Sequence, residues 1–186
     1  MAMKTLGTSR VKTKSKPVED VILFTVQKNK FAIAAKAVDE IRSMEGIEPV
    51  RKSTRQSIHK VKYALETTVK GKSSVHFVVD AAQHYHIADD HERLYARIMV
   101  LRNSYAAVLV DNAERMTRIE AIISLPLAFH GEERDWYRGL AVVDGDVVPV
   151  VEPTSFLSME QEAVLRADWL TAHHAPTEVP AKAIPA

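Results

Sequence analysis

The residues best suited to metal chemistry stand in one polar segment, His84-Tyr85-His86-Ile87-Ala88-Asp89-Asp90-His91. Imidazole nitrogens and carboxylate oxygens are ligands that zinc and nickel take in proteins, and in an extended segment His84 and His86 would point to the same side. A structural zinc site needs four ligands on rigid elements, however, whereas this segment falls in an expected joint between two units. We therefore predict that His84, His86 and His91 face solvent, bind no metal specifically and serve no cofactor.

The remaining reactive side chains do not form a catalytic constellation. Adjacent carboxylates occur at Asp39-Glu40 and Glu132-Glu133. Neighbours in sequence point apart in a strand or a helix, whereas acid–base catalysis needs groups that face each other in a cleft. The sequence has no cysteine, no glycine-rich phosphate loop and no G-x-S-x-G elbow. We predict that the protein is not an enzyme.

Composition narrows the class of protein further. The 186 residues suffice for one ordinary domain or two small ones, and the absence of cysteine suits a reducing compartment. No apolar run approaches the roughly 18 residues of a membrane span, and no signal peptide follows the start, so we expect a cytoplasmic protein that does not insert into membranes. Basic stretches at residues 4–16 and 51–62 lack interleaved aromatic residues, and with a net charge of +1 we expect no nucleic-acid partner.

The elements that would position these side chains occur twice. Residues 21–35 read as strand, polar turn and strand, and residues 97–111 repeat this pattern. A second echo pairs residues 75–80 with 147–152. Self-similarity at a constant offset indicates two copies of one supersecondary unit, and short strands with regular turn signals favour barrels. The apolar positions that match at one offset are Ile22 and Ile98, Phe24 and Val100, and Ile33 and Leu109.

The sequence therefore predicts an all-β protein made of two small β-barrels in tandem, at about 21–90 and 97–157. Between the first strands and Pro49, residues 34–43 have helical spacing, which predicts a short helix or turn. Ser158 is a good N-cap for a closing helix at 159–170. The ends, a basic leader at 1–17 and a tail at 173–186, are predicted to be disordered. The predicted cores contain Phe24, Ile33 and Val78 in one barrel, and Val100, Leu109 and Val150 in the other.

Four motifs follow one another in an order that matches a known family. Val38-Asp39-Glu40-Ile41 resembles a V-x-E-I segment, and Lys70-Gly71 before residues 75–80 resembles an R-G-x-V-x-P-V-V-D-L signature. Residues 107–111 resemble a V-G-L-L-V-D strand, and residues 137–152 resemble a Y-x-x-G ending with a later L-G-D-R. Together they resemble the CheW-like chemotaxis coupling proteins over about residues 18–168. Replacements within the signature, such as lysine for its arginine at position 70, indicate a divergent member.

This resemblance implies two five-stranded barrels around a shared apolar core. It also implies a non-catalytic signalling adaptor of a two-component system, serving chemotaxis or a related motility pathway. Its partners would be the regulatory domain of a CheA-type histidine kinase and the cytoplasmic tip of a chemoreceptor. The partner-binding residues implied by the resemblance are Val38, Glu40, Ile41, Lys70 and Gly71. The alternative is a ligand- or metal-binding β-barrel protein that shares only the fold.

Overall fold

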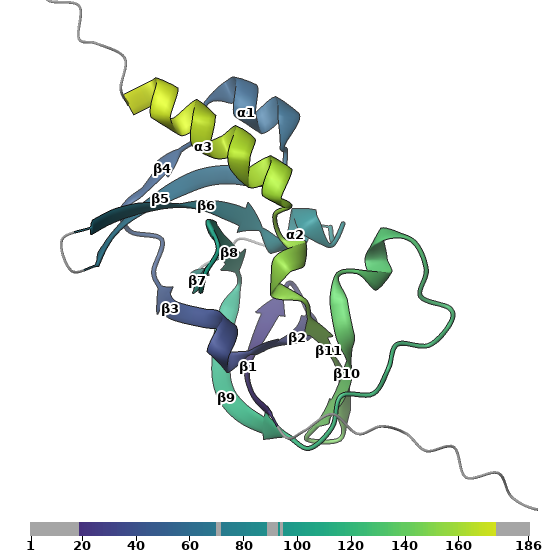
Figure 1. The fold of residues 1–186 in the computed structure, drawn as a ribbon. Coiled ribbons are helices and arrows are strands. Elements are labelled where there is room, and N and C mark those ends of the chain that lie inside the picture. The colour runs from purple at the N-terminus through teal and green to yellow at the C-terminus, as the bar shows by residue number, and fades with distance from the viewer. Residues whose placement is uncertain (1–18, 70–71, 89–92, 94, 174–186) are drawn as a thin grey trace, which may run out of the picture.

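A computed structural model describes residues 19–69, 72–88, 93 and 95–173, so the predicted leader and nearly all of the predicted tail lie outside the described residues. Strands dominate the described part and form two sheets (Figure 1). The five-stranded sheet has the order β10 (Tyr137–Val143), β11 (Asp146–Val151), β2 (Asn29–Ala34), β1 (Glu19–Val26) and β9 (Asn112–Ile119). The six-stranded sheet has the order β3 (Val38–Arg42), β7 (Arg97–Leu101), β8 (Ala106–Val110), β6 (Lys72–Asp80), β5 (Val61–Val69) and β4 (Ile47–Pro49).

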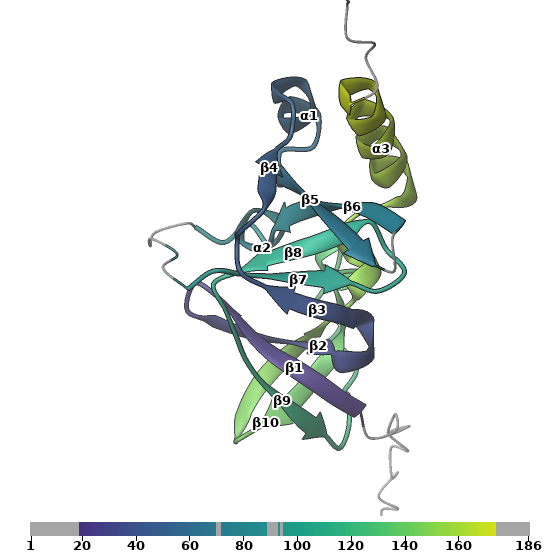
Figure 2. The same cartoon turned by 90° about the vertical axis from the view of Figure 1, so that its left-hand side faces the viewer.

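Short helices connect these strands, and one longer helix ends the described chain. They are η1 (Ala35–Ala37), α1 (Lys52–Ser57), α2 (Ala81–His84), η2 (Glu132–Arg134), η3 (Pro153–Ser155) and α3 (Met159–His173). Figure 2 shows the six-stranded sheet above the five-stranded sheet, with α1 and α3 at the top. The predicted closing helix is therefore present and ends at His173. Its first turn is capped reciprocally, because Gln161 N donates to Ser158 Oγ (3.1 Å) and Ser158 N donates to Gln161 Oε1 (3.2 Å).

The all-β class is confirmed, but the prediction of two tandem barrels is wrong. Neither sheet closes into a barrel in the described residues, and the sheets do not follow the two halves of the chain. The six-stranded sheet uses only the middle of the chain, whereas the five-stranded sheet joins β1 and β2 to β9, β10 and β11. In that sheet β1 pairs antiparallel with β9, and β2 pairs parallel with β11 at Ala32 and Val150. The repeat predicts local hairpins, such as β1–β2 and β7–β8, but holds no information on distant partners.

The main hydrophobic core lies between the two sheets. Phe24, Phe31 and Ile33 from the five-stranded sheet meet Phe77 and Met99 from the six-stranded sheet in this central core, which α2 and α3 complete. Side chains alternate along a strand, so each sheet also has a face that points away from the central core. In both sheets this second face is apolar and packs a smaller core. These smaller cores contain Val21, Leu23, Val143 and Val150 in the five-stranded sheet, and Leu65, Val78, Val100 and Leu109 in the six-stranded sheet.

All six predicted core residues are buried, but they group differently from the prediction. Phe24 and Ile33 belong to the central core, whereas Val78 lies with Val100 and Leu109 in the core of the six-stranded sheet. Val150 is separate, in the core of the five-stranded sheet. Apolar type and strand periodicity were enough to predict burial, while grouping depended on sheet order.

Candidate partner-binding surface

The V-x-E-I segment forms β3, an end strand of the six-stranded sheet, and not the predicted helix. Its backbone pairs antiparallel with the buried strand β7, with Val38 opposite Leu101 and Ile41 opposite Met99. This pairing overrides a weak helical spacing, because tertiary context outweighs local propensity over so few residues. Only η1 retains a helical turn before the strand begins.

A shift in register between Val38 and Glu40 interrupts the alternation of side chains along β3. Val38 is only 7% exposed and packs in the central core. Asp39, Glu40 and Ile41 are then exposed one after another, and Ile41 is 42% exposed. A partner that approached β3 would thus meet Ile41 and two carboxylates, and not Val38. Glu40 lies opposite Val100 and Ile41 opposite Met99, so these two side chains leave the strand on opposite sides. We call the exposed edge formed by Asp39, Glu40 and Ile41 the β3 face.

Two exposed ion pairs frame the β3 face. Asp39 Oδ1 lies 3.1 Å from Arg102 Nη2, and Glu40 Oε1 lies 3.5 Å from Arg42 Nη1. These side chains retain between 37% and 55% of their exposure. Exposed pairs of this kind are worth about 0–1 kcal/mol, so their charges remain available to a binding partner.

Lys70 and Gly71, the other two predicted partner-binding residues, lie outside the described residues. The strands before and after them, β5 and β6, pair with each other. The sheet order places β7 and β8 between β3 and β6. Three strand spacings correspond to about 14 Å, so the sheet does not place the β3 face directly beside the strand that follows Gly71.

The histidine segment is folded differently from the predicted joint. Asp80 caps α2 by accepting a hydrogen bond from Ala82 N (3.1 Å), and the helical turn points His84 inward. The prediction that His84 faces solvent is wrong, since it is only 5% exposed and its ring centroid lies 5.0 Å from that of Phe156. His86 is exposed, and His91 lies outside the described residues. Among the residues that the structure describes, no three histidine or acidic side chains come together as a possible metal shell.

Sequence reasoning missed a buried ion cluster at the ends of β6 and β8. Asp80 accepts hydrogen bonds from Lys62 Nζ (2.8 Å) and forms an ion pair with Arg93 Nη2 (3.0 Å), while Arg93 Nε lies 3.2 Å from Asp111 Oδ1. Burial alone would raise the pKa of Asp80, but the hydrogen bond from Lys62 and the charge of Arg93 bring that pKa below its ordinary value. Asp80 ends β6 and Asp111 directly follows β8, so in the sequence each aspartate comes after an apolar run, which was the available signal. The cluster joins two parallel strands and serves the fold.

No helix within the described ranges is both long and apolar enough to cross a lipid bilayer.

Comparison with known proteins gives a family match and a fold match. A sequence model of the CheW-like domain matches residues 20–161. The crystal structure of the scaffolding protein TtCheW from Thermoanaerobacter tengcongensis is similar to this chain, with a TM-score of 0.62. It is 14% identical in sequence, over 86% of this chain and 99% of that one, so the likeness shows a shared fold. A comparison with curated proteins found no match.

Proposed function

The chain belongs to the CheW-like family of non-catalytic chemotaxis scaffold proteins, and we propose that it is an adaptor that couples a CheA-type histidine kinase to the cytoplasmic tip of a chemoreceptor. The observation that carries the proposal is the family match over residues 20–161, which spans both sheets and the β3 face. The pathway is chemotaxis or a related form of motility. The adaptor acts in the cytoplasm, where the kinase and the receptor tip meet.

The β3 face is the proposed docking surface. A protein interface combines an apolar centre with charged side chains at its rim, and the exposed edge of β3 offers apolar Ile41 together with the charges of Asp39 and Glu40. The β3 backbone is held by pairing with β7, so little conformational entropy is lost when a partner binds. Lys70 and Gly71, which stand between β5 and β6 in the sequence, are proposed as a second contact on the strength of the family motif.

The direct test is a charge reversal at Glu40. Glu40→Lys should weaken binding to the kinase regulatory domain or to a receptor-tip peptide by about 1–3 kcal/mol, the range for an interfacial charge left mispaired. Ile41→Thr, which keeps a β-branched side chain but removes apolar surface, should weaken the same interaction. Glu114→Lys is the matched control, because Glu114 is an exposed carboxylate on β9 of the other sheet. Isothermal titration measures the affinities, and circular dichroism confirms that each variant is folded.

Two negative results have different meanings. Unchanged affinity in Glu40→Lys, Ile41→Thr and Lys70→Glu would exclude the proposed surface while leaving the adaptor function intact. Failure of the unmodified protein to bind either a CheA-type regulatory domain or a receptor tip would refute the adaptor proposal itself.

A further inference from the structure

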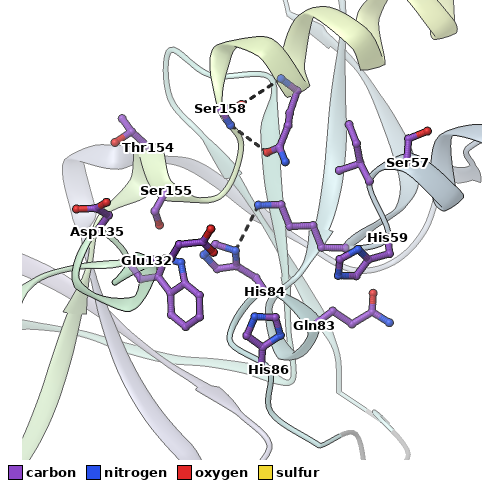
Figure 3. Close-up of a pocket in the computed structure, with 14 residues that line it drawn as sticks. Ser57, His59, Gln83, His84, His86, Glu132, Asp135, Thr154, Ser155 and Ser158 are labelled. Atoms are coloured by element: carbon purple, nitrogen blue, oxygen red, sulfur yellow. Dashed lines mark hydrogen bonds between the residues drawn. The ribbon is translucent and has the colours of Figure 1, made fainter. Parts of the chain in front are cut away.

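A pocket of about 490 Å³ lies where α2, η2 and the start of α3 meet (Figure 3). Its lining includes no residue of β3. Its lining combines a lysine and a buried histidine with two exposed carboxylates and two apolar side chains. These residues are Lys60, His84, Glu132, Asp135, Trp136 and Ile58. Nothing in the adaptor function described above uses this pocket.

The ammonium of Lys60 forms no close ion pair with a described residue, and Glu132, which also lines the pocket, attracts it only from beyond ion-pair distance. The ammonium nitrogen lies 3.5 Å from His84 Nδ1, the contact drawn as a dashed line in Figure 3. No carboxylate among the described residues lies within ion-pair distance of this nitrogen. Burial lowers the pKa of Lys60, while the charge of Glu132 partly restores it. A partly buried cation of this kind is stabilised by an anion that enters the pocket.

His84 cannot supply the negative charge that would balance the ammonium of Lys60. A lysine ammonium can only donate, so His84 Nδ1 must accept and the ring proton must sit on Nε2. That Nε2 atom is buried and has no hydrogen-bond partner among the described residues. Burial, together with the charges of Lys60 and His86, lowers the pKa of His84 to about 3. The ring is therefore neutral near pH 7, and the positive charge beside it in the interior of the pocket is that of Lys60.

The geometry points to a small monocarboxylate with an apolar body as the ligand of this pocket, its carboxylate paired with the ammonium of Lys60. A single negative charge balances Lys60, and the carboxylates of Glu132 and Asp135 repel a phosphate dianion more strongly than they repel a monoanion. Trp136 and Ile58 offer apolar walls for the rest of the ligand.

Benzoate is the probe for this site, and benzamide is its uncharged counterpart of equal shape. Titration of the full-length protein, followed by NMR of amide resonances near His84, should show saturable binding of benzoate. Benzamide and inorganic phosphate should each bind at least tenfold more weakly. Lys60→Met should weaken benzoate at least tenfold, while Lys52→Met, at an exposed lysine of α1 that does not line the pocket, should leave the affinity unchanged.

Glu132→Gln provides an independent measurement, because Glu132 is exposed and the variant does not threaten the fold. Removing its charge should tighten benzoate binding two- to threefold. Unchanged or weaker binding in Glu132→Gln would overturn the assignment even if Lys60→Met failed to fold. The same holds for absence of saturable benzoate binding in the millimolar range, equal affinity for benzamide, or tighter binding of phosphate.

Discussion

Replacement of Asp80 by alanine should destabilise the fold by about 3 kcal/mol. Asp80 is 1% exposed and makes three contacts, to Ala82 N (3.1 Å), Lys62 Nζ (2.8 Å) and Arg93 Nη2 (3.0 Å). Loss of the helix cap costs about 1 kcal/mol, and loss of charge-assisted hydrogen bonds in a buried site costs about 2 kcal/mol more. The total stays at the lower end of the usual 3–5 kcal/mol for a broken buried pair. The reason is that Lys62 is 33% exposed to water and Arg93 keeps Asp111 at 3.2 Å.

Urea unfolding followed by circular dichroism measures this loss. Asp80→Asn keeps a capping oxygen and the side-chain shape but removes the charge, so it should lose about 2 kcal/mol. Asp39→Ala is the matched control, since its ion pair with Arg102 is half exposed, and should lose no more than about 0.5 kcal/mol. A loss in Asp80→Ala that equals the loss in Asp39→Ala would refute the argument that the cluster supports the fold.

The same cluster makes the free energy of unfolding depend on pH. The folded pKa of Asp80 lies below its ordinary 3.8, because Lys62 and Arg93 outweigh the effect of burial. The unfolded chain therefore takes up this proton first as the pH falls. The stabilisation from Asp80 is complete above about pH 4 and is lost as the pH falls through the folded pKa. Acid unfolding of Asp80→Asn should accordingly show a shallower slope below pH 4 than the unmodified protein.

Three further substitutions test other parts of the fold. Burial lowers the pKa of His84 to about 3, so below pH 6.5 the unfolded chain gains a proton that the folded chain excludes. This residue should therefore lower the free energy of unfolding by about 2 kcal/mol from pH 7 to pH 5. Urea midpoints of His84→Phe should lack this decrease, and an equal pH dependence of the midpoint in both proteins would contradict it. Gly139→Ala should lower the free energy of unfolding by at least about 2 kcal/mol, because the backbone has φ +152° and the added Cβ would clash with a neighbouring backbone carbonyl. Gly46→Ala, in open space, should lower it by about 1 kcal/mol. Similar shifts of the melting temperature in both variants would count against the clash. Leu165→Ala should lose about 3 kcal/mol of unfolding free energy, since Leu165 is 1% exposed in the central core. Val164→Ala, at a 53% exposed position, should change the urea midpoint little. A small loss in both variants would show that α3 adds little to the stability of the fold.

Features that depend on neighbours in sequence were predictable. The hairpins β1–β2 and β7–β8 follow from the repeated pattern of strand, turn and strand, and the start of α3 follows from Ser158 as its N-cap. Both rest on contacts within a few residues, which a pattern of residue types reports directly.

Pairing between distant strands was not predictable from the same patterns. Val150 and Ala32 are opposite each other in parallel strands, yet many other apolar residues would suit either position. His84 shows a second limit, since a polar neighbourhood in sequence predicted exposure, while a four-residue helix capped by Asp80 turned the ring inward. Ile41 is exposed in the end strand of the six-stranded sheet although it lies opposite the buried Met99, and no spacing of residues indicates the order of strands.

The order of strands also constrains how this protein is made on the ribosome. The six-stranded sheet uses one continuous stretch from β3 to β8, so it can assemble as soon as that stretch has emerged. The hairpin of β1 and β2 emerges first, but β11, the partner of β2, ends only at Val151. At ordinary rates of synthesis the hairpin waits on the order of 10 s for that strand. During this interval β2 keeps an unpaired edge and apolar faces, so the nascent chain should need chaperone protection until β11 is complete.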